Sequence, residues 1–301
     1  MKSGIINVYK EAGFTSFDVV AKLRGILKMR KIGHTGTLDP MAVGVLPVCL
    51  GNGTKLCDML TDRSKTYEAV MLLGKATDTE DTSGEVVKET PVNVTEEEVC
   101  NVINSYIGEY DQIPPMYSAL KVDGKKLYEL ARAGKTIERK ARRVIINSIE
   151  ILAVNLPYVT MRVDCGKGTY IRSLCRDIGE SLGICACMDK LTRTRVGSFD
   201  IEDSLTLSDI EMLVQEGKVE QNIVSLTDVL AEYPLLNVNP EYKKKIDNGN
   251  PLATDMFNED ISPTADDIYR INNAEGQFFA LYRYDEATDR MMPHKIFPLE
   301  V

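Results

Sequence analysis

The residues with the clearest chemical potential lie between Gly33 and Pro47, in the string Gly-His-Thr-Gly-Thr-Leu-Asp-Pro-Met-Ala-Val-Gly-Val-Leu-Pro. It contains His34, one of only two histidines in the chain, and Asp39, which stands between Leu38 and Pro40. The glycines and prolines exclude a regular helix or a central strand, so we expect a sharply turning loop. Burying an unpaired carboxylate in such apolar surroundings is costly. Asp39 is therefore either a turn-forming residue before proline or a reactive group.

The same string resembles the catalytic loop of the TruB-type tRNA pseudouridine-55 synthases, from Gly33 to Pro40 and again at Gly44 and Leu46-Pro47. The resemblance implies that Asp39 is the catalytic aspartate of that family. Further segments resemble the family in the same order, and looser similarity extends to the end of the chain. These segments are the Lys-x-Tyr of residues 65–67 and residues 74–84, 113–134, 166–172 and 191–197.

The resemblance implies an α+β pseudouridine-synthase fold with a mixed, largely antiparallel sheet in residues 1–232. A small PUA-like β-barrel is expected in residues 236–301. The implied reaction isomerises uridine 55 in the T-arm of tRNA to pseudouridine without a cofactor. The glycosidic bond at N1 breaks and the base is reattached through C5. The sequence leaves open whether Asp39 attacks the sugar carbon or the uracil ring.

The resemblance also implies roles for individual side chains. Tyr67 corresponds to the tyrosine that stacks on the target base, and Arg172 to the arginine that pairs with the catalytic aspartate. A neighbouring cation would favour the ionised, nucleophilic form of Asp39 in a desolvated pocket. The remaining residues expected to bind substrate are His34, Lys65, Tyr170 and Leu191.

Periodicity predicts the elements that must position these residues. A helix beginning after Thr15 or Ser16 leads into the Gly33–Pro47 loop, and a Thr95–Glu98 capping box begins another. Helices are predicted in residues 16–27, 95–106, 127–132, 171–182 and around 207–214. Strands are predicted in residues 5–8, 64–74, 144–152, 159–165, 268–271, 278–283 and 295–297. We interpret residues 74–84 as loop structure rather than as part of the chemistry.

The charge distribution separates two parts of the chain. The net charge is -9, but residues 200–301 hold 8 basic and 21 acidic residues. Residues 121–143 hold nine basic and three acidic residues, and residues 22–31 add five basic residues and no acidic one. Basic runs are often only solvated surface, but here they favour a polyanionic partner. We interpret residues 113–134 as an insertion that grips RNA. The predicted RNA-binding residues are Lys125, Lys126, Arg132, Arg142 and Arg143.

Other classes of protein are disfavoured. The seven cysteines form no Cys-x-x-Cys pair, and with two distant histidines they provide no zinc site at the usual spacings. No apolar run approaches the roughly 20 residues that span a bilayer, and the first residues lack a signal-peptide pattern. We therefore expect a cytoplasmic protein with no metal and no membrane association. We also expect a monomer, and the resemblance implies that its partner is tRNA.

Three alternative functions have recognisable requirements. A guide-RNA-dependent pseudouridine synthase would share these motifs, but the long basic extensions expected of that branch are not seen. A non-catalytic RNA-binding protein would need a broken catalytic loop, whereas Asp39, Tyr67 and Arg172 are all present. A nucleotide-dependent RNA enzyme would need a phosphate loop, and the glycine-containing run at residues 51–55 lacks the Walker spacing.

Overall fold

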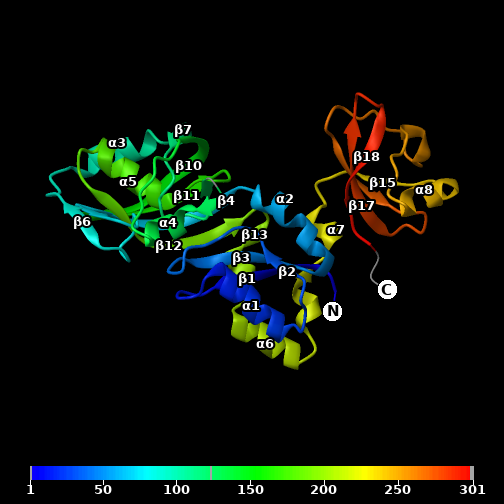
Figure 1. The fold of residues 1–301 in the computed structure, drawn as a ribbon, viewed down its shortest axis with the longest axis horizontal. Helices are drawn as coiled ribbons and strands as arrows, with labels where there is room; N and C mark the ends of the chain where they lie inside the picture. The colour runs from blue at the N-terminus through cyan, green and yellow to red at the C-terminus, as the bar shows by residue number, and fades with distance from the viewer. Residues whose placement is uncertain (1, 123, 299–301) are drawn as a thin grey trace.

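The computed structural model describes residues 2–122 and 124–298. It has one long mixed sheet with helices packed on it and a separate, smaller C-terminal sheet (Figure 1). The helices are α1 (Ser16–Ile26), α2 (Cys57–Thr61), α3 (Glu96–Asn104), α4 (Leu127–Arg132), α5 (Ile171–Ser181), α6 (Leu207–Gln215), α7 (Leu226–Val229) and α8 (Lys243–Asp247). The α+β class is as predicted.

The long sheet has the strand order β14-β1-β3-β12-β4-β11-β10-β7, with β2 beside β3 and β13 beside β12. Only the ladder between β3 and β12 is parallel among the described ladders of this sheet. The strands are β1 (Gly4–Lys10), β2 (Ile32–His34), β3 (Val43–Leu50), β4 (Lys65–Leu73), β7 (Gly108–Gln112), β10 (Arg142–Asn155), β11 (Tyr158–Cys165), β12 (Ala186–Val196), β13 (Phe199–Asp200) and β14 (Ile223–Val224).

Two apolar clusters hold helices on this sheet. One contains Val99 and Ile103 of α3 and Leu174 of α5, packed with the buried positions of β4, β11 and β12. The other packs α1 and α6 on β1 and β3. The clean alternation predicted for residues 159–165 is confirmed, because the valines, methionine and cysteine of β11 are fully buried. The capping box predicted at Thr95 begins α3, and of the two caps considered for α1 the structure has Thr15, which also forms a capping box.

The prediction that Gly33–Pro47 excludes a central strand is wrong. Only the middle of this stretch is a loop, because β2 ends at His34 and β3 begins at Val43 and lies between β1 and β12. Pro47 is tolerated there because of the side that its nitrogen faces. Its carbonyl accepts a hydrogen bond from the Thr35 N–H at 3.2 Å and so points toward the loop. The nitrogen of an antiparallel residue faces the same side as its carbonyl. The missing N–H of Pro47 therefore faces the loop and removes no bond to β1.

Gly44 explains why the loop needs glycine at its end. Its φ is 103°, and a Cβ placed there would lie 2.2 Å from the carbonyl oxygen of Arg193. Any side chain would therefore prevent the parallel contact between β3 and β12. That central strand, β12, was not among the predicted strands.

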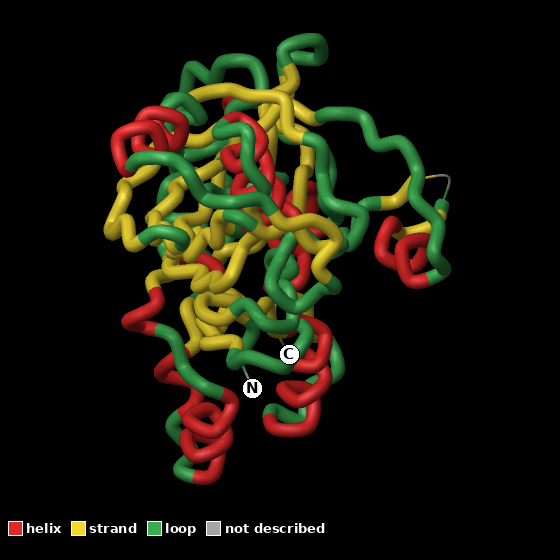
Figure 2. The backbone as a smooth tube through the Cα atoms, turned by 90° about the vertical axis from the view of Figure 1, so that its left-hand side faces the viewer, coloured by secondary structure: helices red, strands yellow, loops and turns green. Residues whose placement is uncertain are grey.

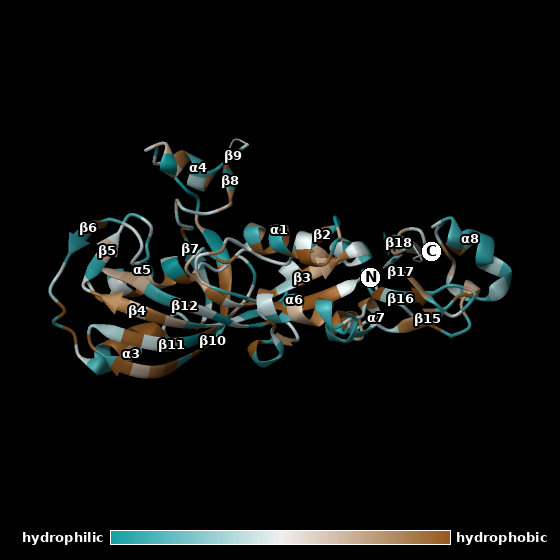
Figure 3. Cartoon of the chain, turned by 90° about the horizontal axis from the view of Figure 1, so that it is seen from below, coloured by the Kyte–Doolittle hydropathy of each residue, from teal (hydrophilic) through white to brown (hydrophobic). Residues whose placement is uncertain are grey.

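Two small hairpins extend from the main sheet. One is formed by β5 (Lys75–Thr77), which lies within residues 74–84 interpreted as a loop, and β6 (Val86–Glu89), which follows them. The other is formed by β8 (Lys121–Val122) and β9 (Lys125–Lys126), which precede α4. Figures 2 and 3 show this second hairpin and α4 standing away from the body of the molecule. This hairpin and α4 belong to residues 113–134, which we call the insertion.

The C-terminal sheet has the order β15-β16-β17-β18. Its strands are β15 (Leu235–Asn237), β16 (Ile268–Asn272), β17 (Phe278–Asp285) and β18 (Arg290–Ile296). The last strand begins earlier than predicted. In the part of the chain that the structure describes, no ladder joins β15 to β18, so a separate C-terminal sheet is present but a closed barrel is not shown.

The C-terminal sheet shares an apolar core with the main unit. Leu281 of β17 and Phe297 are buried in the same cluster as Leu56, Leu60 and Phe199. Polar contacts reinforce the junction, since the Lys295 ammonium lies 2.7 Å from the Asp58 carboxylate. The two units are therefore fixed to each other by burial as well as by the chain.

Within residues 2–122 and 124–298, no group of three or more potential metal ligands is found, and no helix is long and apolar enough to cross a membrane. All seven cysteines are free. Cys185 and Cys187 are both buried, as expected of small core residues.

Candidate active site

Asp39 and Arg172 form an ion pair across a separation of 133 residues. Asp39 lies in the loop between β2 and β3, and Arg172 is the second residue of α5. The Nη2 of Arg172 donates to Oδ1 of Asp39 at 2.9 Å, and its Nε lies 2.9 Å from Oδ2. Both carboxylate oxygens are thus held by the planar fork of a single guanidinium. The structure brings these two predicted residues together as the resemblance implied.

The electrostatics of Asp39 reflect two opposing effects. Burial raises the pKa of its carboxyl above the usual aspartate value, and the nearby Asp81 raises it further, whereas Arg172 lowers it. The side chain of Arg172 is 5% exposed and that of Asp39 is 34% exposed. The carboxylate is therefore held by a buried cation while part of its surface stays accessible to a ligand.

Arg172 also joins the site to two other segments. Its Nη1 donates to the Thr79 carbonyl at 3.0 Å, and its Nη2 donates to the Tyr117 carbonyl at 2.8 Å. The Asp81 carboxylate lies 3.8 Å from its Nε. The interpretation of residues 74–84 as loop structure alone is therefore incomplete, because this segment contacts the partner of Asp39. The segment also contributes a second carboxylate to the electrostatics of the site.

Lys10, the last residue of β1, binds the backbone of the loop that carries Asp39. It is completely buried, and its Nζ donates to the carbonyls of Pro40 at 3.0 Å and Ala42 at 2.6 Å. Burial lowers the pKa of Lys10 to about 8, although the negative charge of Asp39 opposes that shift. Lys10 therefore stabilises the turn that follows Asp39 and places a second cation near its carboxylate.

Arg193 of β12 connects the loop to Tyr67. It is 1% exposed, and its guanidinium donates to the Val45 carbonyl at 2.7 Å and to the Gly36 carbonyl at 3.3 Å. The same guanidinium lies beside the hydroxyl of Tyr67, whose pKa is raised to about 12 by burial. One buried arginine thus holds both ends of the loop and the tyrosine.

The predicted substrate-binding residues from β2 and β4 lie in different environments. His34 is half-buried, its Nδ1 accepts from the Gly36 N–H at 3.3 Å, and burial lowers its pKa. Lys65 is buried, and its Nζ donates to the carbonyls of Thr61 and Arg63, each at 2.8 Å. Burial lowers the pKa of Lys65 to about 8. Its ammonium is thus occupied by backbone carbonyls, and a direct substrate contact stays a prediction.

Tyr170 lies at the start of α5, and Leu191 lies on β12. Tyr170 precedes α5, where its backbone N–H donates to the Gln112 side chain at 2.8 Å and its carbonyl accepts from the same amide at 3.0 Å. Burial raises the pKa of its hydroxyl. Leu191 is buried in the cluster that also contains Leu38 and Tyr67. Leu191 therefore packs with a residue of the Asp39 loop, and a substrate contact by either Tyr170 or Leu191 stays a prediction.

The five predicted RNA-binding residues separate into two groups. Lys125, Lys126 and Arg132, which we call the insertion set, lie on β9 and α4. Arg142 and Arg143, the strand pair, begin β10. The guanidinium of Arg143 lies 2.8 Å from the carboxylates of both Glu109 and Asp111 on β7. Two acids therefore already compensate one member of the strand pair, and the insertion set is the more available positive charge.

Sequence reasoning missed Lys10, Asp81 and Arg193. Lys10 ends an apolar strand and resembles an ordinary edge lysine. Arg193 lies two residues after Leu191, so both side chains are on the buried face of β12, but that strand was not predicted. Asp81 lies in a polar turn with several other acids and hydroxyls. Alternation along β12 was the one usable signal, because it places Arg193 on the same face as Leu191.

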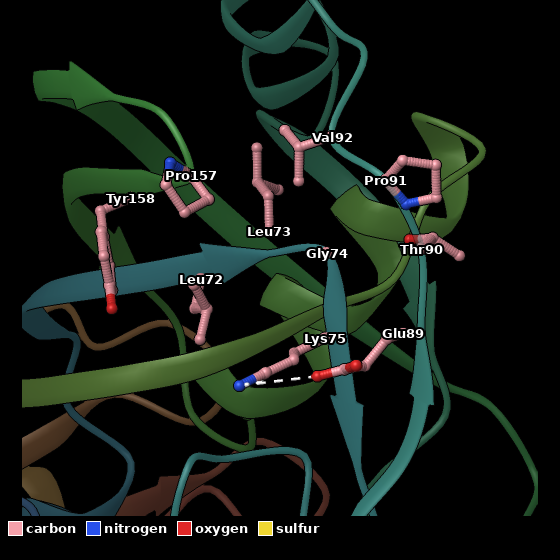
Figure 4. A pocket seen from close by; sticks show the side chains of 10 residues that line it. All are labelled: Leu72, Leu73, Gly74, Lys75, Glu89, Thr90, Pro91, Val92, Pro157 and Tyr158. Carbon is pink, nitrogen blue, oxygen red and sulfur yellow. Dashed lines mark ion pairs between the residues drawn. The ribbon is translucent and has the colours of Figure 1, made fainter.

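Two open pockets do not include Asp39 among their lining residues. One of about 560 Å³ lies at the far end of β4 and is lined by residues 72–75, 89–92, Pro157 and Tyr158 (Figure 4). Figure 4 also shows the exposed Lys75–Glu89 ion pair at its rim. A second open pocket, of about 900 Å³, lies between α5, β6 and the insertion and includes Glu80 and Arg176.

Family comparisons match the chain in two consecutive parts. Residues 24–171 match the TruB family pseudouridylate synthase (N terminal domain), and residues 172–235 match the tRNA pseudouridylate synthase B C-terminal domain. A tRNA pseudouridine synthase B of Lachnoclostridium phytofermentans is 52% identical over 98% of this chain and 99% of its own length. The enzyme of the same name from Clostridium tetani is 46% identical over 93% of this chain and 94% of its own.

Solved structures show the same fold. A chain from an H/ACA RNP bound to a substrate RNA containing 2'-deoxyuridine aligns with a TM-score of 0.74 and 26% identity, covering 98% of this chain and 85% of that one. A chain from a Cbf5-Nop10-Gar1 complex aligns with a TM-score of 0.73 and 28% identity, covering 99% and 84%. The overall arrangement of both units is thus shared with proteins from RNA-containing and protein complexes.

Proposed function

The chain belongs to the TruB family of tRNA pseudouridine synthases, and we propose that it isomerises uridine 55 in the T-arm of tRNA with Asp39 as the nucleophile and without a cofactor. Family membership establishes an isomerase that converts uridine to pseudouridine in tRNA. The observation that supports the finer assignment is the ion pair between Asp39 and Arg172, in which both carboxylate oxygens are bound by one buried guanidinium.

The reaction needs an ionised carboxylate in a desolvated position. Arg172 favours that form, and Lys10 adds a second positive charge close by. In the proposed reaction the N1–C1' bond breaks and a C5–C1' bond forms, while the proton lost from C5 is balanced by the one gained at N1. No atom is added or removed and no electrons are transferred. Asp39 can assist by attacking either the sugar carbon or the uracil ring.

The target base must leave its stack before Asp39 can reach it. Flipping a nucleotide costs about a few kcal/mol, and stacking on an aromatic ring recovers roughly 1–3 kcal/mol per base. Tyr67 is our proposed stacking residue, and Leu191 provides apolar surface beside it. The contact between Arg193 and the Tyr67 hydroxyl would keep the ring in one orientation. His34, at the entrance to the loop, is proposed to contact the opened RNA.

The polyanion is proposed to lie along the insertion and α1. The insertion set contributes three cations, and α1 with the residues after it contributes the five basic residues of 22–31. Salt-sensitive phosphate contacts of this kind position RNA without reading its sequence. The excess of acidic residues in 200–301 supports the proposal that the polyanion lies on the first part of the chain.

The test is to incubate the purified chain with an unmodified tRNA transcript and map pseudouridine at each position. We expect modification at position 55 and none in a transcript that carries cytidine there. Asp39→Asn should abolish product while tRNA affinity stays within about tenfold, or roughly 1.4 kcal/mol. Substantial turnover by Asp39→Asn, with mass spectrometry excluding deamidation to Asp, would refute the nucleophile assignment.

The structural likeness to chains from an H/ACA RNP makes a guided enzyme the second candidate. The same assay separates the two, because it contains no guide RNA. Product formed by the chain alone supports the standalone enzyme. Product that appears only after a guide RNA is added would support the other.

A further inference from the structure

Helix α5 carries a second arginine one turn after Arg172, and the proposed reaction does not use it. The Nη1 of Arg176 donates to the Glu80 carboxylate in a short contact, and its Nη2 donates to the Ile113 carbonyl at 3.1 Å. Its Nε and Nη2 also bind Asp177, at 2.9 and 2.7 Å. The Glu80 and Arg176 side chains are 12% and 20% exposed, so this is a largely buried ion pair.

Glu80 has an unusual backbone conformation that its contacts maintain. Its φ is 64°, in the left-handed region that residues with side chains seldom adopt. The Ser173 hydroxyl donates to Oε2 of Glu80 at 2.7 Å while Arg176 binds Oε1. The Glu80 carbonyl accepts from the Met188 N–H at 3.0 Å. Contacts to α5 and β12 thus fix both the side chain and the backbone of Glu80.

The strained residue lies between two groups that meet Arg172. Thr79 precedes Glu80 and offers its carbonyl to Nη1 of Arg172 at 3.0 Å. Asp81 follows Glu80 and places its carboxylate 3.8 Å from Nε of the same side chain. Because Glu80 turns the chain between them, both neighbours face the guanidinium that binds Asp39.

The same two arginines hold the base of the insertion. Arg176 binds the carbonyl of Ile113, and Arg172 binds the carbonyl of Tyr117. Both carbonyls precede the hairpin and helix that carry the insertion set. A shift of Arg176 would therefore move one support of the insertion and, through Glu80, two groups around Arg172.

We propose that Glu80, through its contacts with Arg176 and Ser173, is a positioning residue for the Arg172–Asp39 pair. It holds the 79–81 turn against α5 so that Arg172 keeps its fork on both oxygens of Asp39. This inference rests on the proposed function. It assigns the Glu80 carboxylate no contact with RNA or with the reacting base, so its removal is expected to affect the rate of isomerisation rather than tRNA affinity.

The test compares Glu80→Ala with Glu150→Ala. Glu150 also pairs with an arginine, Arg162, but on the exposed outer face of the sheet. We expect Glu80→Ala to lower the single-turnover rate at saturating tRNA by about tenfold to a hundredfold, as misplacement of reacting groups does. The Kd for tRNA should stay within about twofold, or roughly 0.4 kcal/mol. Glu150→Ala should keep the parent rate.

Glu80→Gly separates the carboxylate from the backbone strain, because glycine adopts a φ of 64° readily. We expect the same loss of rate as in the alanine variant. Full activity of Glu80→Gly would overturn the role of the carboxylate, as would parent rates in both variants. Thermal unfolding of each variant shows whether the chain is folded at the assay temperature.

A double variant tests whether Glu80 acts through Arg172. In an Arg172→Lys background, Glu80→Ala should cause little further loss, because the fork it positions is already gone. Fully additive losses would overturn the proposal. Failure of the proposed function is recognised separately: the parent chain would then make no pseudouridine at position 55, or Asp39→Asn would stay active.

Discussion

Arg172→Lys is the sharpest single test of how the site works, because it keeps the charge and removes the fork. Arg172 contacts both carboxylate oxygens of Asp39 and also donates to the carbonyls of Thr79 and Tyr117. A lysine presents one nitrogen at the end of a flexible chain and cannot reach all these acceptors at once. The variant therefore retains general electrostatic attraction but loses the fixed orientation of Asp39.

The expected magnitude follows from the hydrogen bonds that lysine cannot make. At least one charge-assisted hydrogen bond to Asp39 disappears, and such bonds contribute about 1.5–3 kcal/mol each. If that stabilisation acts on the reactive geometry, the rate falls by roughly tenfold to a hundredfold, since each 1.4 kcal/mol is about one factor of ten. The loss should be visible in the single-turnover rate at saturating tRNA, while the Kd for tRNA changes little.

Arg162→Lys is a matched control. Arg162 also places Nε and Nη2 on one carboxylate, that of Glu68, and Nη1 on Glu150, but its side chain is 43% exposed. Exposed pairs contribute little, so this variant should keep the parent rate. An Arg172→Lys rate equal to the parent, or the same rate loss in both variants, would refute the claim that the buried fork orients Asp39.

Two further predictions concern pH and salt. Burial raises the pKa of the Asp39 carboxyl, whereas Arg172 lowers it. The rate should therefore fall at acid pH as Asp39 becomes protonated. Arg172→Gln should move this acid limb of the pH–rate profile to higher pH, because the variant loses the charge that lowers the pKa. Asp81→Asn should move the acid limb to lower pH, because the Asp81 charge raises the pKa of Asp39. This electrostatic account would be contradicted if the pH–rate profiles of the two variants shifted in the same direction. Alanine at the insertion set should flatten the plot of log tRNA affinity against log salt by about 0.7–0.9 for each phosphate that is no longer neutralised. Alanine at the strand pair should flatten it less, because acids already compensate Arg143, and salt titrations showing the reverse order would place the RNA on β10.

Sequence reasoning predicted the Asp39–Arg172 pair but not the residues that support it. The pairing of Asp39 with Arg172 was predictable because both stand in strings that resemble one family. The supporting contacts of Lys10 and Arg193 go to backbone carbonyls, which have no side-chain identity in a sequence. Burial also lowers the pKa of both cations. That burial follows from the positions of β1 and β12 beside the loop, which the sequence alone did not predict.

Local rules failed where tertiary structure overrode them. Pro47 predicted a loop, yet it lies in a central strand because its nitrogen faces the side where no ladder bond is needed. Glu80 gave no sign of a left-handed conformation, since the contacts that impose it come from Ser173, Arg176 and Met188. Each of those partners is more than ninety residues away in the chain.

The C-terminal unit differs in composition from the main unit, but its stability is not independent of it. The acidic, loop-rich composition begins near residue 232 and β15 begins at Leu235, so the change along the chain is real. Yet Leu281 and Phe297 are buried with Leu56, Leu60 and Phe199 of the main unit. Uncovering large apolar side chains costs about 1.5–3 kcal/mol each, against a total stability of about 5–15 kcal/mol for a typical domain. Removing residues 236–301 would therefore disturb the segment just after β3 as well as any RNA contact. For this reason, the role of the C-terminal unit in binding tRNA is better measured with substitutions on its exposed surface than by truncation.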